Sequence, residues 1–355
     1  MTVVLLFFVL ALGLALAFEF VNGFHDTANA VATVIYTNTL TPTVAVIWSG
    51  IFNFLGAIVS SGAVAYSIVK LVPFAAVSVP IAFAMIFSVL LAAIAWNLGT
   101  WFYAIPTSSS HTLIGSILGM GMANSLMHGG TLLAGLNVGK AIAVGQALLL
   151  SPVVGFVGAI VVYVLLRTLI PNEQLYREPK KRKAPPFWIR LLLLGTCSAV
   201  SFAHGSNDGQ KGMGLVMLIL LAVFPLTYAT MATAATIPFW VKLIVAVALG
   251  LGTMVGYKRV VKTVGEKIGK SHMTYGQGAT AELVTAITIG VADQYGLPVS
   301  TTQILNSSVG GTMAAGGVGL QWNTVRTILL AWVLTLPVTM LASGTIFTIL
   351  FLLVA

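Results

Sequence analysis

Residues 22–30, NGFHDTANA, place a histidine and an aspartate, His25 and Asp26, inside an otherwise apolar segment. Residues 204–212, HGSNDGQKG, repeat the pattern, with a glycine followed three positions later by Asp208, and we expect each motif to interrupt its apolar helix. An ionisable side chain at membrane depth is costly, so by default it marks a transport pathway or a binding site. The duplicated aspartate therefore predicts a membrane protein built from two related halves.

A second motif follows each aspartate motif. Residues 105–111, IPTSSSH, and residues 297–303, LPVSTTQ, both set a proline shortly before a run of hydroxyl side chains. These hydroxyl residues are Ser108, Ser109, Ser110, Ser300, Thr301 and Thr302. Helical repeats interrupted at corresponding positions are typical of secondary transporters whose site lies near the bilayer midplane. We expect residues 1–168 to be the first transmembrane repeat, residues 191–355 the second, and residues 169–190 a basic cytoplasmic linker.

The composition excludes a soluble globular domain. Of the 355 residues, 58% are hydrophobic and only 7% are charged, whereas soluble domains carry roughly a quarter charged residues. Hydrocarbon leaves backbone polar groups unsatisfied, which favours helices, and no strand-like alternation is visible. We therefore expect an all-α polytopic membrane protein of about 10–12 membrane-embedded segments, multi-pass in the plasma membrane. The apolar stretches 105–123 and 297–316 are too short to cross twice, which predicts re-entrant hairpins and broken helices.

The net charge of +9 comes from 17 basic and 8 acidic residues, and its position indicates topology. Most basic residues fall within residues 167–190 and 258–270, beside hydrophobic segments, as cytoplasmic loops do under the positive-inside rule. The expected partner is therefore the lipid bilayer and not nucleic acid. Among the acids, Glu19 and Asp293 are interpreted as helix-end positions.

The proline motifs have the chemistry of an anion site. Proline at a first helical position followed by serine and threonine predicts a strong helix start, with backbone N–H groups and hydroxyls directed at one point. The helix dipole adds partial positive charge there, so phosphate or sulfate can be held without an arginine.

The aspartates would repel an anion held nearby, so a cation must accompany it. Oxygens of Asp26, Asn29, Asn207 and Asp208 are hard ligands suited to Na⁺, and protonation of the carboxylates would serve equally. In either case cation binding favours anion binding, and this linkage between two ligands is symport.

Other polar residues near the motifs bear on the choice of ion. His25 can titrate near neutral pH and is a candidate proton acceptor. Lys211 stands where the first repeat has Asn29, and it could itself offset a carboxylate. Glu282, in an apolar segment before the second proline motif, is a candidate for lining the same cavity. His111 and His204 are interpreted as hydrogen-bonded helix-end histidines, and no spacing resembles a metal cluster, so no metal ligand and no cofactor is assigned.

The motifs resemble those of the inorganic phosphate transporter family, PiT, and are most similar to bacterial low-affinity Pit transporters. The resemblance covers four separated runs: EFVNGFHDTANAVATVIYT, WNLGTWFYAIPTSSSHTLIG, FAHGSNDGQKGMGLVML and LPVSTTQILNSSVGGTM. It implies two inverted-topology repeats and phosphate uptake driven by a cation gradient. It also implies that the six hydroxyl residues bind phosphate and that Asp26, Asn29, Asn207 and Asp208 bind the cation.

The chain departs from the family pattern, Gly-Ala-Asn-Asp-x-x-Asn, at two positions. His25 replaces the first asparagine, and Lys211 replaces the last asparagine of the second copy. These departures resemble the bacterial subgroup thought to use protons and to carry phosphate as a neutral complex with divalent metal.

We expect a secondary active transporter that imports inorganic phosphate by alternating access with protons as the coupling ion. Na⁺ is the alternative ion, and sulfate or another oxyanion is the alternative substrate. A passive channel and an intramembrane hydrolase are less favoured, the latter because no Gly-x-Ser-x-Gly turn is present. We thus expect no enzyme activity. Oligomeric state, including a homo-oligomer, is left open by the sequence.

Overall fold

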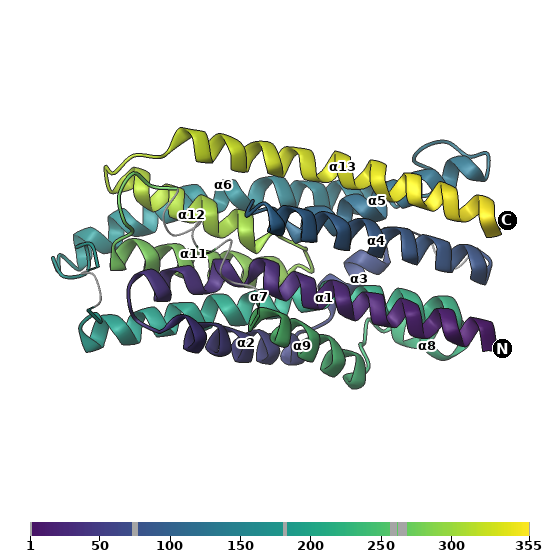
Figure 1. The fold of residues 1–355 in the computed structure, drawn as a ribbon, viewed down its shortest axis with the longest axis horizontal. Helices are drawn as coiled ribbons and strands as arrows, with labels where there is room; N and C mark the ends of the chain where they lie inside the picture. The colour runs from purple at the N-terminus through teal and green to yellow at the C-terminus, as the bar shows by residue number, and fades with distance from the viewer. Residues whose placement is uncertain (1, 73–76, 180–182, 256–260, 262–267, 355) are drawn as a thin grey trace.

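The computed structural model describes residues 2–72, 77–179, 183–255, 261 and 268–354. They form an elongated bundle whose N-terminal and C-terminal ends lie at the same end (Figure 1). Within these ranges there are twelve helices, and the sole β pairing is an isolated bridge between Gly269 and Leu320.

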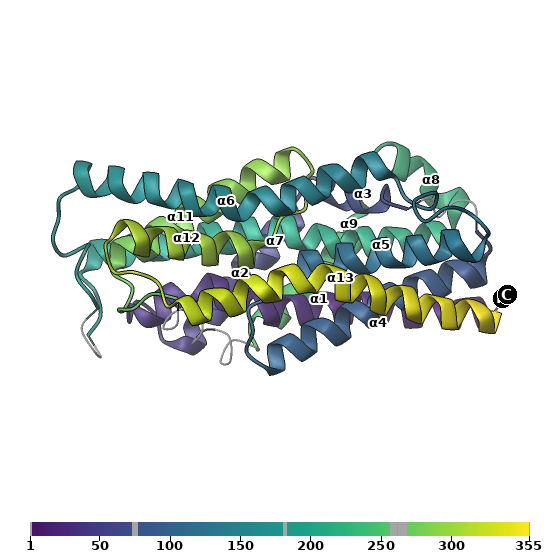
Figure 2. The ribbon, with the colours of Figure 1, turned by 90° about the horizontal axis from the view of Figure 1, so that it is seen from above.

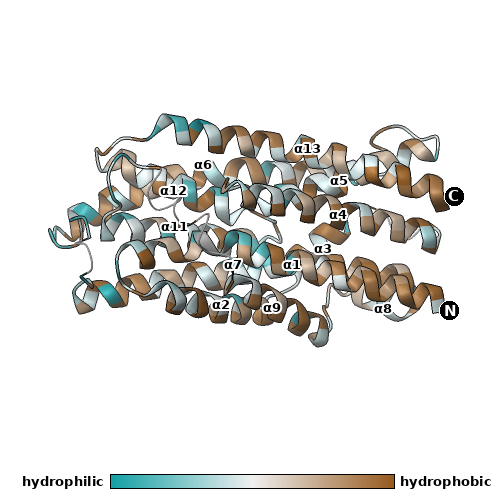
Figure 3. Ribbon diagram, in the orientation of Figure 1, coloured by the Kyte–Doolittle hydropathy of each residue, from teal (hydrophilic) through white to brown (hydrophobic). Residues whose placement is uncertain are grey.

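The helices follow one another along the chain in this order: α1 (Thr2–Tyr36), α2 (Pro42–Val59), α3 (Ala63–Val69), α4 (Val79–Phe102), α5 (Ser109–Met127), α6 (Val138–Leu169), α7 (Phe187–Val223), α8 (Pro225–Thr233), α9 (Phe239–Thr253), α11 (Tyr275–Gln294), α12 (Thr301–Ala315) and α13 (Trp322–Val354). Six of them, α1, α2, α4, α6, α7 and α13, are long and apolar enough to cross a membrane. Hydrophobic colour accordingly covers most of the ribbon (Figure 3). The prediction of an all-α polytopic membrane protein is confirmed.

The linker between α6 and α7 lies at the end of the bundle opposite the chain termini (Figure 1). Its basic residues Lys180, Lys181 and Arg182, and the basic residues Lys258, Arg259, Lys262 and Lys267 of the later loop, lie outside the described residues. The cytoplasmic placement of this end and the division into two repeats stay predictions.

The aspartate motifs lie within α1 and α7, which run through them without a break. We expected these motifs to interrupt their helices, and that expectation is wrong. Neither motif contains proline, and a glycine costs a helix only about 1 kcal/mol relative to alanine. The breaks fall at the proline motifs instead, at residues 103–108 between α4 and α5 and at residues 295–300 between α11 and α12.

These two breaks form the tips of two helical hairpins. The α4–α5 pair occupies one half of the bundle and the α11–α12 pair the other half, and the two tips meet near the middle (Figures 1 and 2). Helices α5 and α12 therefore both begin at the centre of the molecule. Inverted topology of the repeats is compatible with this arrangement and stays a prediction.

Helices α2 and α7 approach closely through glycines. A Cβ placed on Gly205 of α7 would lie 2.6 Å from the Cα of Asn53 on α2, and one placed on Gly56 of α2 would lie 2.8 Å from the backbone nitrogen of Ser206. Real Cβ atoms do not approach this closely, so only glycine allows this crossing. The close approach brings Asn53 beside the aspartate motif of α7.

We expect Gly205→Ala to lower the stability of the protein by about 1–3 kcal/mol, because the added methyl group meets rigid backbone. The matched control is Gly195→Ala on the same helix, where an added Cβ meets nothing within 4 Å. Alanine is the better helix former, so the control should be neutral or stabilising. Thermal unfolding in detergent measures both, and equal shifts in the two variants would contradict the close approach.

Candidate functional site

Two helix N-termini converge at the centre of the bundle. Ser108 caps α5, and its Oγ accepts a hydrogen bond of 3.1 Å from the backbone N–H of His111. Ser300 caps α12 and accepts one of 3.2 Å from the N–H of Gln303. The prolines lie two residues before these caps, not at the first helical position as expected, because serine satisfies the helix N–H groups at the cap itself.

The two tips touch each other and share one carboxylate. Ser110 Oγ donates a hydrogen bond of 2.6 Å to the backbone carbonyl of Val299 in the opposite tip. Asp26 accepts from Ser109 at 2.9 Å on one carboxylate oxygen and from Thr302 at 2.7 Å on the other. All these polar side chains are buried. Asp26 thus joins the N-terminus of α5 to that of α12.

The rest of the first motif surrounds Asp26. His25 Nδ1 lies 3.0 Å from Asp26 Oδ1, and the other ring nitrogen of His25 lies 3.3 Å from the hydroxyls of Thr100 and Thr107. Asn29, one helical turn after Asp26, donates from Nδ2 to Thr302 Oγ1 at 2.7 Å. The side chain of Asn29 therefore holds the second tip as well.

Asp208 forms a buried ion pair within its own helix. Lys211 Nζ lies 2.6 Å from Asp208 Oδ1, three residues away along α7, and both side chains are 1% exposed. The same ammonium contacts Ser110 Oγ and lies 3.4 Å from the carbonyl of Val299. A fixed positive charge therefore lies against the contact between the two tips.

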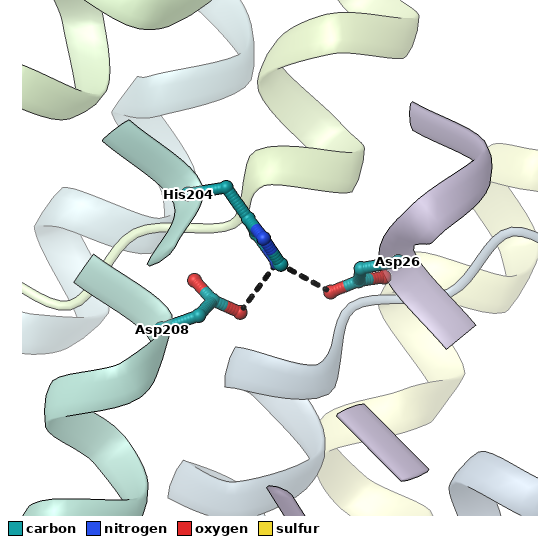
Figure 4. A group of neighbouring side chains, drawn as sticks. All are labelled: Asp26, His204 and Asp208. Carbon is teal, nitrogen blue, oxygen red and sulfur yellow. Dashed lines mark ion pairs between the residues drawn. The ribbon is translucent and has the colours of Figure 1, made fainter. Parts of the chain in front are cut away.

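His204 stands between the two aspartates (Figure 4). Its Nε2 lies 3.4 Å from Asp208 Oδ2 and 3.9 Å from Asp26 Oδ2. Its Nδ1 lies 2.9 Å from Asn53 Oδ1, while Asn53 donates its amide to Thr253. Because Asn53 offers only an oxygen to the ring, Nδ1 is assigned the proton, and Nε2 then suits two carboxylates when it carries a proton or coordinates a metal.

The three side chains Asp26, His204 and Asp208 could also hold a metal ion, since their ligand atoms lie within 4.8 Å of one another. Carboxylate and imidazole ligands suit several divalent metals. The sequence did not predict this group, because its members meet only when α1 and α7 pack together.

Three further predicted site residues do not contact either aspartate of the cluster in a hydrogen bond that the structure describes. Asn207 binds the second tip, donating to the carbonyl of Leu297 at 3.1 Å and accepting from the N–H of Val299 at 3.3 Å. Thr301 is buried beside the capping Ser300 and its hydroxyl has no hydrogen-bond partner within the described ranges. Glu282 is buried and accepts from Thr196 at 2.6 Å, and no contact with the central cluster is described for it.

The two acids interpreted as helix-end residues differ in outcome. Asp293 is the penultimate residue of α11, as expected, and it accepts hydrogen bonds from Ser206 and Gln210 of α7. Glu19 lies in the interior of α1 and His204 in the interior of α7, so the helix-end interpretation is wrong for both, whereas His111 lies in the first turn of α5 as expected.

Sequence reasoning missed the partners that orient the two histidines. Thr100 and Thr107 contact His25, and Asn53 contacts His204. One signal was present: His204 precedes Asp208 by four residues, a spacing that brings side chains together on a helix. Asn53 carried a weaker signal, as a single amide within an apolar helix.

Known proteins similar to this chain are phosphate transporters. The profile of the phosphate transporter family matches residues 22–343. The low-affinity inorganic phosphate transporter PitA of Escherichia coli (strain K12) is 36% identical, over 96% of this chain and 95% of that protein. A probable low-affinity inorganic phosphate transporter of Bacillus subtilis (strain 168) is 38% identical, over 95% of each. A solved structure, "The sodium-dependent phosphate transporter", shares the fold with a TM-score of 0.81 at 22% identity, covering 98% of this chain and 99% of that one.

Proposed function

The chain belongs to the phosphate transporter family, as its motifs predicted, and from this premise we propose that it imports inorganic phosphate by symport with protons. Members of the family are transporters and not enzymes, and this chain has the helices of a multi-pass plasma membrane protein. The observation that carries the proposal is the convergence of two serine-capped helix N-termini on Asp26, beside the Lys211 ammonium.

Phosphate suits this arrangement better than sulfate does. Helix N-termini and hydroxyls donate hydrogen bonds to the oxygens of any tetrahedral oxyanion. The carboxylate of Asp26 lies between these two N-termini and can only accept hydrogen bonds, so an anion bound beside it must donate one. Phosphate keeps a proton near neutral pH and can donate it to Asp26, whereas sulfate has none to give. Excess sulfate should therefore compete poorly with phosphate, and equal competition would contradict this part of the proposal.

The charges of the cluster support coupling to a cation. Asp26 and Asp208 set two negative charges against the one positive charge of Lys211, and phosphate adds at least one more negative charge. An uncompensated buried charge is strongly unfavourable, so positive charge must enter with the anion. His204 Nε2, which faces both carboxylates, offers a place for one proton.

Protons are favoured over Na⁺ by the position of Lys211. In the first repeat, the Asn29 side-chain oxygen has no hydrogen-bond partner among the residues that the structure describes, and it could ligate Na⁺. At the corresponding position of the second repeat, the ammonium of Lys211 already neutralises Asp208 at 2.6 Å. A fixed cation there removes the need for a second mobile one.

Because the whole cluster is buried, substrate must reach it through a conformational change, which supports alternating access.

The test is radiolabelled phosphate uptake into proteoliposomes of the purified protein at clamped membrane potential. We expect concentrative uptake when a pH gradient alone is imposed, and none when a Na⁺ gradient alone is imposed. The reverse result would assign Na⁺ as the coupling ion. Flux that dissipates gradients without accumulation under either condition would contradict symport and favour a channel.

A second measurement asks whether a divalent metal accompanies the phosphate. The grouping of Asp26, His204 and Asp208 favours this possibility, since it could ligate the metal of a neutral metal-phosphate complex. Uptake of labelled Co²⁺ that depends on phosphate would support co-transport. Phosphate uptake that is unchanged after all divalent metal is chelated would exclude it.

A further inference from the structure

Glu19 is a buried acid that the central cluster does not use. It lies on α1, two turns before Asp26, and its side chain is 0% exposed. Its polar neighbour is the side chain of Asn22, one turn further along, and among the described residues no hydrogen-bond partner other than this pairing is found for either side chain. A buried carboxyl whose polar neighbour is a single amide needs an explanation, because buried polar groups are normally fully hydrogen-bonded.

The carboxyl of Glu19 lies directly against the backbone of α7. A Cβ placed on Gly212 would lie 2.5 Å from Glu19 Cδ and 2.6 Å from its Oε1. Gly212 is the residue after Lys211, so the missing side chain leaves room for the carboxyl next to the ion pair of Lys211 with Asp208. Glu19 precedes Asp26 by seven positions, about 10 Å along the helix axis, so its carboxyl forms a site separate from the central cluster.

The charged groups that act on Glu19 belong to α7 and are Asp208, Lys211 and His204. The neighbouring helices contribute little: α2, α4 and α12 contain no ionisable side chain, and Lys242 of α9 donates to the carbonyl of Ser60. The other acidic and histidine side chains of adjoining helices already have partners, namely His25 and Asp26 on α1, His111 on α5, and Glu282 and Asp293 on α11. Glu19 therefore responds to the charge of the phosphate site.

We propose that Glu19, with Asn22 beside it, is a second coupling-proton site on the N-terminal side of Asp26 along α1. This inference rests on the proposed function. A proton needs one oxygen atom, whereas Na⁺ in proteins needs several, and Glu19 and Asn22 together offer three side-chain oxygens. A buried carboxylate beside a single amide is far less costly when neutral, so the site suits a proton.

Coupling follows from charge. Phosphate bound at the tips adds negative charge beside Asp208 and Lys211, which makes protonation of Glu19 more favourable. By linkage, a protonated Glu19 makes phosphate binding more favourable to the same extent. The proton comes from water on one side of the membrane, bonds to a carboxylate oxygen of Glu19, and returns to water on the other side.

The test separates phosphate exchange from proton-driven accumulation in proteoliposomes. Counterflow of labelled against unlabelled phosphate at equal pH needs substrate binding and the conformational change, but no net proton movement. Accumulation under a pH gradient needs the proton. We expect Glu19→Gln to keep counterflow and to lose accumulation by at least about tenfold, since a linkage of this kind is typically 5–150-fold. Glu178→Gln, at an exposed acid of the linker, is the matched control and should lose neither.

The possible outcomes are distinct. Normal accumulation in Glu19→Gln overturns the proposal, and so does loss of counterflow and accumulation together in a variant that remains folded. If Glu19→Gln does not fold, Gly212→Ala serves instead, because its methyl group must displace the carboxyl, and unchanged accumulation there overturns the proposal. Absence of phosphate counterflow in the wild-type protein would be a failure of the proposed function and not of this inference alone.

Discussion

Lys211→Met and Asp208→Asn are each expected to abolish phosphate uptake and to lower the free energy of unfolding by about 3–5 kcal/mol. The two side chains form an ion pair of 2.6 Å and are 1% exposed, so removing either one leaves the other charge buried and uncompensated. In Lys211→Met, the remaining Asp208 carboxylate still lies near His204, which can partly compensate its charge. This variant should therefore lose less stability than Asp208→Asn. Thermal unfolding in detergent measures stability, and proteoliposomes measure uptake.

The double variant Lys211→Met with Asp208→Asn distinguishes structure from function. It should recover most of the lost stability, because a neutral pair leaves no buried charge. It should not recover uptake, because the fixed positive charge at the contact between the tips is gone. Glu173→Gln, which removes the exposed pair with Arg177, should change neither quantity. Uptake restored in the double variant would show that the ion pair serves folding only.

Much of the fold could be predicted because membrane helices leave direct signals in sequence. Long uncharged stretches predicted the spanning helices, and the capping serines Ser108 and Ser300 follow from simple N-cap chemistry. The duplicated motifs predicted correctly that two helix starts of the same kind exist. Their meeting at Asp26 depends on the tertiary structure and could not be predicted from the sequence, although both motifs have the chemistry of the same anion site.

The parts that could not be predicted depend on packing between distant helices. The polar side chains within α1 and α7 are hydrogen-bonded or ion-paired by partners that mostly lie on other helices, which the sequence does not reveal. The position of His204 between two carboxylates requires Asn53, which reaches it only because Gly205 lets α2 approach α7. The burial of Glu19 likewise depends on Gly212 of another helix. Glycines at helix crossings are common in membranes, so nothing in the sequence distinguished these two.

Asp26→Asn is expected to reduce phosphate uptake by about 100-fold or more. The carboxylate accepts one hydroxyl from each tip, from Ser109 at 2.9 Å and from Thr302 at 2.7 Å. Asparagine keeps the shape but offers one acceptor oxygen and sets an amide donor against the other hydroxyl. Hydrogen bonds to charged groups contribute about 1.5–3 kcal/mol each, and two of them correspond to roughly two to four powers of ten in an equilibrium constant. Initial rates of labelled phosphate uptake, with counterflow measured in parallel, provide the test.

Asp293→Asn is the matched control, since it makes the same chemical change in an acid of the second hairpin that contacts α7 and neither helix N-terminus. Asp293 accepts from Ser206 and Gln210, so it fastens α11 to α7. Its replacement should reduce uptake by less than about tenfold, because one partly exposed site is lost and the junction of the tips remains. Comparing the two variants therefore distinguishes an acid that only holds a hairpin in place, Asp293, from one that joins the two helix N-termini, Asp26. If both variants reduce uptake equally, Asp26 only holds a hairpin in place. That result would contradict the proposal that phosphate binds between the two helix N-termini.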